Sequence, residues 1–96
     1  IHDLDVESDR NFGRAAVLDE AKALITGERA VEHGEASSTF KKIAERWSSR
    51  LDCDVSSKDV AAMMIDLKLV RNQQNPHVKD NYVDIAGYAA LGAELD

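Results

Sequence analysis

The sequence predicts an all-α fold, namely a four-helix antiparallel bundle with a flexible N-terminal arm. Apolar residues recur at three- and four-residue spacings, and no segment alternates apolar and polar residues as a strand would. A chain of 96 residues fits one domain with a thin core, which a second copy could extend. The mostly polar residues 1–12 are the expected arm, and residues 13–96 are the expected single helical domain.

The first helix is expected from Arg14 to about Thr26, because apolar residues recur there at near-helical spacing. These residues are Ala15, Leu18, Ala21, Leu24 and Ile25. Gly27 is a natural stop, since glycine adopts a positive φ without a Cβ penalty. Residues 28–37 are expected to form an ordered loop.

The second helix has the clearest pattern, and either Ser38 or Thr39 is expected to cap it. Its apolar residues form one stripe along the helix: Phe40, Ile43, Ala44, Trp47 and Leu51. Because Phe40 and Trp47 lie on this stripe, we interpret them as core residues and not as a platform for stacking bases.

The third and fourth helices are expected on either side of a polar segment. Ser56 with Asp59 three residues later is a capping signature, and the helix that follows is apolar nearly all round. Such a helix lies centrally or at a subunit interface. Residues 72–75 break its pattern, and Asn75 as cap with Pro76 in the first turn then starts a fourth helix that runs to about Ala93.

Composition narrows the function classes. A formal net charge of −6 argues against a nucleic-acid polymer as partner, because phosphate binding depends on clustered Lys and Arg. The single cysteine, Cys53, excludes an intrachain disulfide and a cysteine-based zinc site, which favours a reducing, cytoplasmic setting. The longest apolar runs are too short to span a bilayer, and no secretory signal is visible, so no membrane partner is expected.

Asp80 and Asp84 are the first candidates for a functional site. They lie four residues apart on one face of the predicted fourth helix, with Tyr88 at the border of that face. Two carboxylates so placed could hold Mg²⁺, and the ion would in turn bind a phosphate group. The alternative is that they complement the helix dipole and pair with Lys68 or Arg71 on the third helix.

Lys68 and Arg71 are the second pair, and both emerge from the apolar side of the third helix. Beside two carboxylates they would form a pocket for an anion or a phosphate. The alternative is an interhelical salt bridge, or side chains that cover core residues with their aliphatic stems. Gly87 lies inside the fourth helix and is expected to permit close helix packing, although it could also admit a ligand.

One pattern of residues extends over about residues 17–93. Its members are Leu18-Asp-Glu-Ala, Ile25-Thr-Gly-Glu-Arg29, His33-Gly34, Phe40, Ile43-Ala44, Trp47, Asp59-Val, Met63-Met64, Lys68, Arg71, Asn75-Pro76, Asp80 and Val83-Asp-Ile-Ala-Gly-Tyr88. In this pattern the chain resembles a family of small phage and prophage proteins of unknown function. The resemblance implies a phage origin, hence the cytoplasm of a bacterial host, and no particular activity.

A more distant similarity rests on Asn81-x-x-Asp84 and the following Ile-Ala-Gly-Tyr. This segment resembles the second half of the metal-binding pattern of the MazG-like all-α nucleoside triphosphate pyrophosphohydrolases, with Asn81 where a glutamate is expected. The first half, a glutamate cluster, is missing. This similarity therefore implies nucleotide binding more than hydrolysis.

Two functions follow as hypotheses. The first is a phage protein that binds a nucleoside phosphate, with or without turnover, in which Asp80 and Asp84 hold Mg²⁺. Its predicted ligand contacts are Lys68, Arg71, Tyr88 and, on a covering loop, Arg29 and His33. The second is a non-catalytic helical module that binds or sequesters a protein or a small anionic ligand. Either would be a homodimer or larger oligomer, formed through the surfaces at residues 63–67 and 87–91.

Overall fold

The structure, a computed structural model, describes residues 13–27 and 35–95. These residues form four helices and no strand, which confirms the all-α prediction. The helices are α2 (Arg14–Thr26), α4 (Ala36–Leu51), α5 (Ser57–Gln74) and α6 (Lys79–Glu94). The predicted arm at residues 1–12 and most of the predicted loop, residues 28–34, lie outside the described residues.

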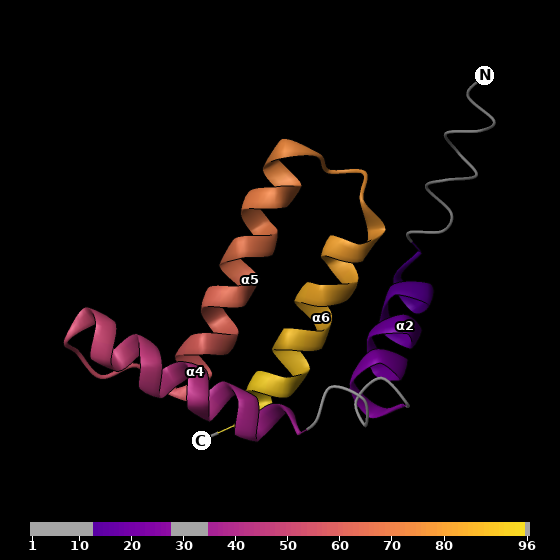
Figure 1. The fold of residues 1–96 in the computed structure, drawn as a ribbon. Coiled ribbons are helices and arrows are strands. Elements are labelled where there is room, and N and C mark those ends of the chain that lie inside the picture. The colour runs from indigo at the N-terminus through magenta and orange to yellow at the C-terminus, as the bar shows by residue number, and fades with distance from the viewer. Residues whose placement is uncertain (1–12, 28–34, 96) are drawn as a thin grey trace.

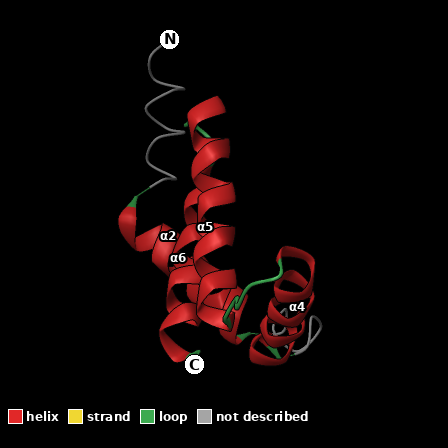
Figure 2. Ribbon diagram, turned by 90° about the vertical axis from the view of Figure 1, so that its left-hand side faces the viewer, coloured by secondary structure: helices red, strands yellow, loops and turns green. Residues whose placement is uncertain are grey.

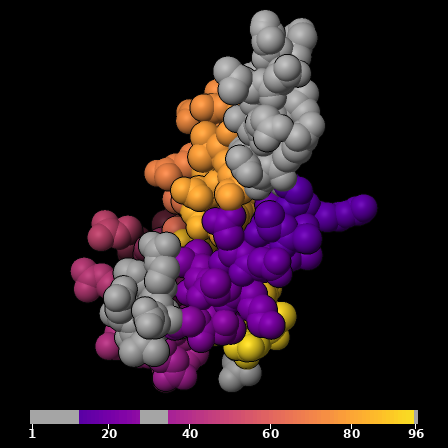
Figure 3. Space-filling model, turned by 90° about the vertical axis from the view of Figure 1, so that its right-hand side faces the viewer, coloured from indigo at the N-terminus to yellow at the C-terminus, as the bar shows by residue number. Residues whose placement is uncertain are grey.

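Three of the helices lie side by side, and the fourth crosses their end. α5 and α6 form an antiparallel hairpin, and α2 packs against α6 on the side away from α5 (Figure 1). α4 crosses the lower end of the hairpin and packs against α5, which Figure 2 shows from the side. In Figure 3, α2 forms the outer surface of its side of the molecule, with parts of α6 visible above and below it.

The ends of the first two helices have simple local causes. α2 occupies the predicted residues and stops at Gly27, whose backbone N–H donates to the Ala23 carbonyl at 2.9 Å. The expected positive φ at Gly27 is wrong, because its φ is −96°. Glycine suits this position for another reason, since a Cβ would lie only 2.7 Å from the Ala23 carbonyl oxygen. α4 begins earlier than predicted, so the assignment of Ser38 or Thr39 as its cap is wrong. Extended backbone at Glu35 already supplies the first helical acceptor, which Thr39 N–H contacts at 3.2 Å.

α5 begins at the predicted capping box. The Ser56 hydroxyl accepts from the Asp59 N–H at 3.0 Å, and the Asp59 carboxylate accepts from the Ser56 N–H at 2.9 Å. Asp59 is therefore occupied as a capping residue. Two donors that a helix start leaves without partners are satisfied in this way.

The connection between α5 and α6 differs from the prediction. α5 continues through Gln74 and ends at Asn75, so Asn75 does not cap α6. Its side-chain oxygen instead accepts from the His77 N–H at 3.1 Å, a turn that competes with helix formation. Pro76 consequently lies in the turn, and α6 starts only at Lys79.

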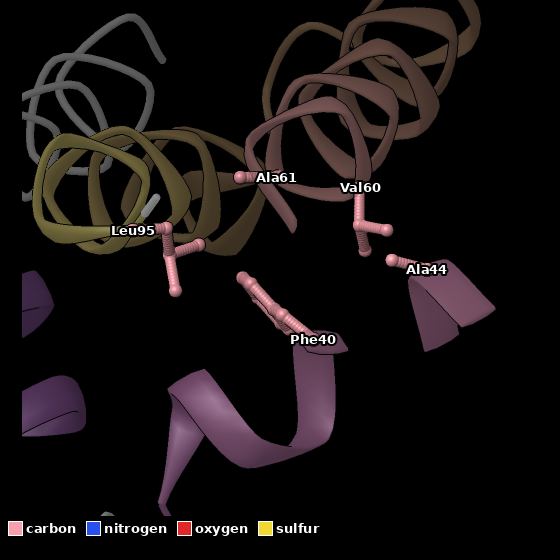
Figure 4. Close-up of a cluster of buried hydrophobic side chains, with 5 residues drawn as sticks. All are labelled: Phe40, Ala44, Val60, Ala61 and Leu95. Atoms are coloured by element: carbon pink, nitrogen blue, oxygen red, sulfur yellow. The ribbon is translucent and has the colours of Figure 1, made fainter. Parts of the chain in front are cut away.

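The hydrophobic core lies where α4 crosses the hairpin (Figure 4). Its buried members are Phe40, Ala44, Val60, Ala61 and Leu95. Val60 is fully buried, and Trp47, Tyr88 and Leu91 pack around the cluster. The prediction that Phe40 and Trp47 belong to the core is confirmed, because Phe40 is buried in the cluster and Trp47 packs against it. The apolar stripe of α4 is thus covered by the hairpin.

Two glycines of α6 face its neighbours. A Cβ on Gly87 would lie 3.4 Å from Cγ2 of Ile25 in α2, an ordinary contact, so the helices lie close here but leave room for an alanine. A Cβ on Gly92 would lie 3.2 Å from the Cβ of Ala61 in α5, which is tighter than usual. Gly92 thus helps to set how near α5 lies to α6. Among the described helices, none combines the length and apolar character needed to cross a membrane.

Candidate functional site

The predicted site residues Lys68 and Asp84 meet across the hairpin. The Lys68 ammonium lies 2.9 Å from Oδ2 of Asp84, and the two side chains are 13% and 27% exposed. The interhelical salt bridge considered as an alternative for Lys68 is therefore present. A carboxylate and an ammonium held together at this depth neutralise one another and join the two helices.

Further contacts fix how α5 and α6 align. Near the lower end of the hairpin, the Lys58 ammonium donates to the Gly92 carbonyl at 2.6 Å. Ala61 also faces Gly92, and Lys68 faces Asp84 further along. One antiparallel register satisfies all three contacts, because each step forward on α5 matches a step backward on α6.

The same register places two asparagines opposite each other, one turn nearer the connection than the ion pair. Asn81 on α6 is 6% exposed, and it is the one buried polar residue in the described chain. The side-chain oxygen of Asn72 on α5 is buried without a hydrogen-bond partner in the described residues. An unsatisfied buried oxygen costs about 1–3 kcal/mol, so this part of the hairpin is polar at the expense of stability.

We call these four residues, Lys68, Asn72, Asn81 and Asp84, the interhelical polar cluster. The sequence prediction identified its two charged members but did not assign Asn72 a place inside the hairpin. A signal was available, because Asn72 follows Lys68 by four residues and so lies on the same face of α5. It was obscured by the prediction that residues 72–75 break the helical pattern, whereas α5 continues through Gln74.

Asp80, Asp84 and Tyr88 follow one another along a single face of α6. Asp80 is exposed in the first helical turn, where a carboxylate complements the helix dipole. Tyr88 packs against the core cluster, with its ring centroid 6.1 Å from that of Phe40. This face of α6 therefore changes from exposed carboxylate, through the ion pair, to an aromatic side chain packed beside α4.

The remaining predicted ligand residues are not joined to this cluster. Arg71 is exposed in the last turn of α5, where its charge favours the negative end of the helix dipole. Arg29 and His33 lie outside the described residues. The structure thus brings together two of the four charged residues predicted to surround a phosphate, and the ligand assignments stay predictions.

The described residues offer few ligands for a metal ion. No group of three or more His, Cys, Asp or Glu side chains within residues 13–27 and 35–95 is arranged to hold one. A Mg²⁺ ion at Asp80 and Asp84 would therefore need water or phosphate oxygens for most of its coordination, as Mg²⁺ commonly does. A shallow depression does occur on α4, but its lining residues, Glu45, Arg46, Ser49 and Arg50, include none of the predicted site residues.

Comparison with known proteins places the chain among phage proteins. It is 38% identical over 77 residues to the Gene 55 protein of Mycobacterium phage L5, covering 79% of this chain and 49% of that protein. It is 39% identical over 74 residues to the Gene 55 protein of Mycobacterium phage D29, covering 77% of this chain and 49% of that protein. The chain thus spans about half the length of these curated relatives, and no solved structure matches it.

The predicted resemblance to small phage proteins of unknown function is confirmed. The similarity to MazG-like pyrophosphohydrolases stays a prediction, because neither the names of these two relatives nor the description of the matching family refers to such an activity. A family described as "Domain of unknown function (DUF6378)" matches residues 16–96, which is most of the chain. The chain therefore belongs to this family of phage proteins of unknown function.

Proposed function

We propose that this chain is a non-catalytic helical module that binds a partner in the cytoplasm of the phage's bacterial host. The observation that carries the proposal is the Lys68–Asp84 ion pair. To coordinate a metal ion or a phosphate, either group would first have to give up a charged partner in a largely buried setting. Both are therefore better suited to fixing the hairpin than to carrying out chemistry.

A protein partner is favoured over a small ligand by the surface of α5. Four large apolar side chains on this one helix are 39–50% exposed: Met63, Leu67, Leu69 and Val70. Three of them, Met63, Leu67 and Val70, share one face of the helix by their spacing, and exposed apolar surface of this kind typically marks a protein interaction site. By contrast, the depression on α4 is lined by charged and polar side chains, without the apolar enclosure typical of small-molecule sites.

Binding of a nucleoside phosphate is the second candidate, and a different observation favours it. Asp80 and Asp84 share a face of α6 whose N-terminal half is not covered by α4, the helix that crosses the other end (Figure 1). Lys68 lies against Asp84 at the edge of that surface. In this proposal Mg²⁺ joins the two carboxylates to a phosphate group, and Lys68, Arg71 and Tyr88 provide further contacts.

Thermal unfolding with and without Mg²⁺, across nucleoside mono-, di- and triphosphates, separates the two candidates. Nucleotide binding predicts a Mg²⁺-dependent stabilisation of about 2.7 kcal/mol at a ligand concentration one hundred times Kd. Asp80→Asn should abolish the stabilisation, because it removes one of the two carboxylates proposed to hold Mg²⁺. Asp80 is exposed, so this change leaves the Lys68–Asp84 ion pair intact. Asp19→Asn, at an exposed carboxylate on α2, is the matched control and should retain it.

The outcomes decide between the functions. A midpoint that no combination of metal and nucleotide shifts removes the nucleotide candidate. A Mg²⁺-dependent shift that Asp80→Asn loses, together with release of phosphate or pyrophosphate, overturns the non-catalytic module.

A further inference from the structure

The outward side of α5 carries an apolar stripe. Met63, Leu67 and Val70 follow one another at i, i+4 and i+7, and they are 39%, 41% and 50% exposed. By helical spacing they lie opposite the residues that face α6, such as Ala61 and Lys68. We call these three residues the outer stripe. In Figure 2 this side of α5 faces the viewer, and no described helix passes in front of it.

Opposite charges border the outer stripe. Asp66 precedes Leu67 by one residue, whereas Arg71 follows it by four, so the two side chains flank Leu67 on different sides. Both residues are exposed. In heptad terms Leu67 is an a position between Met63 and Val70 at d, with Asp66 at g and Arg71 at e.

We propose that the outer stripe binds the outer stripe of a second copy of this chain, with the two α5 helices parallel. This rests on the proposed binding function and names its partner. In a parallel pair a g residue lies near the e residue five positions later in the other helix, which brings Asp66 to the partner's Arg71. Antiparallel pairing would instead place Asp66 against the partner's Asp66. The charges therefore select a second copy in parallel orientation.

The crossing of α4 limits the size of this contact. Val60, at the preceding a position, is fully buried under α4 and is not available to a partner. The free stripe therefore extends over residues 63–71, little more than two helical turns. We therefore expect a weak dimer, which forms at high protein concentration and dissociates on dilution.

Sedimentation equilibrium from about 10 μM to about 1 mM tests the pairing. The average mass of the chain should rise toward that of a dimer as concentration increases. Leu67→Lys should hold the chain as a monomer throughout, because it places two like charges at the centre of the contact. Leu18→Lys is the control, since Leu18 is 61% exposed on α2, and it should dimerise like the unchanged chain. Circular dichroism verifies that each variant keeps its helices.

Charge reversal at two exposed residues, Asp66 and Arg71, tests the orientation, and circular dichroism again verifies that each variant keeps its helices. Asp66→Arg and Arg71→Asp should each weaken the dimer roughly tenfold, because each places like charges opposite one another twice. Combining both changes in one chain should restore dimerisation, as should mixing the two single variants. Glu45→Arg, an equal change of charge on the outer side of α4, should have no effect.

Two results would overturn the proposal. A chain that stays monomeric at all concentrations has a different partner for the outer stripe, and the proposed binding function survives that result. A dimer that Leu67→Lys leaves intact, or that both single charge reversals leave unchanged, is not formed by parallel α5 helices.

Discussion

Removing one member of the Lys68–Asp84 pair is expected to destabilise the fold more than removing an ordinary surface charge. The two groups are 2.9 Å apart, and their side chains are 13% and 27% exposed. At that distance Coulomb attraction is about 6 kcal/mol for an effective dielectric constant of about 20, and about 1.4 kcal/mol in bulk water. Desolvation of both ions cancels most of the larger figure.

The expected loss lies between the values for exposed and buried pairs. Exposed pairs contribute about 0–1 kcal/mol, and breaking a fully buried pair costs about 3–5 kcal/mol. We therefore expect Asp84→Asn to lower the free energy of unfolding by about 2 kcal/mol, since Lys68 is left largely buried without a counterion. For a domain of this size, that corresponds to a decrease in Tm of roughly 8–16 °C.

A double-mutant cycle measured by urea unfolding separates the interaction from the cost of each substitution. Lys68→Met keeps the aliphatic stem and removes the charge, so it is the partner change for Asp84→Asn. The coupling between the two should be about 1–2 kcal/mol. The pair of Lys79 and Glu20, which joins α6 to α2, is the control, because its side chains are 27% and 46% exposed. Its coupling should stay below about 0.5 kcal/mol.

Additive effects would refute this reasoning. If Asp84→Asn and Lys68→Met sum to the effect of the double variant, the pair contributes nothing beyond its separate side chains. The Lys68–Asp84 pair could then not be what aligns α5 with α6, and the main support for a non-catalytic module would be lost.

Three further predictions concern helix ends and packing, and all are measured as changes in the unfolding midpoint. Ser56→Ala should cost about 1 kcal/mol by removing one half of the capping box, and the control Ser49→Ala on the exposed side of α4 should cost little. Gly87→Ala should stabilise the chain by up to about 1 kcal/mol, because its new Cβ makes an ordinary contact at 3.4 Å. Gly92→Ala should gain less, because its new Cβ would lie 3.2 Å from the Cβ of Ala61 and α5 would have to shift slightly. Val60→Ala should cost about 2 kcal/mol, because Val60 is fully buried in the core and a cavity would remain.

Local signals in the sequence predicted the helices well where one residue type decides the boundary. Gly27 ended α2 at the expected residue, although with a negative φ, and the capping box of Ser56 and Asp59 started α5 as expected. Prediction failed where polar residues allow two local structures. Asn75 and Pro76 are as suited to a turn as to a helix start, and contacts between α5 and α6 resolve that choice.

The candidate site was predictable only within each helix. Helical spacing placed Asp80 and Asp84 on one face of α6, but it cannot measure the distance from Asp84 to Lys68 on another helix. Nor could it show that Asn72 reaches the inside of the hairpin, since that depends on how far α5 continues.

The amino-acid order alone determined an all-α chain, the positions of its helices to within a few residues, and the phage family to which it belongs. Tertiary structure decided which charge each charged residue faces and which apolar residues remain exposed. The physical reason is that spacing along a helix fixes only the direction of a side chain. Whether that direction meets Asp84, the core under α4, or open solvent depends on how separate helices pack, as Lys68, Val60 and Leu67 respectively show.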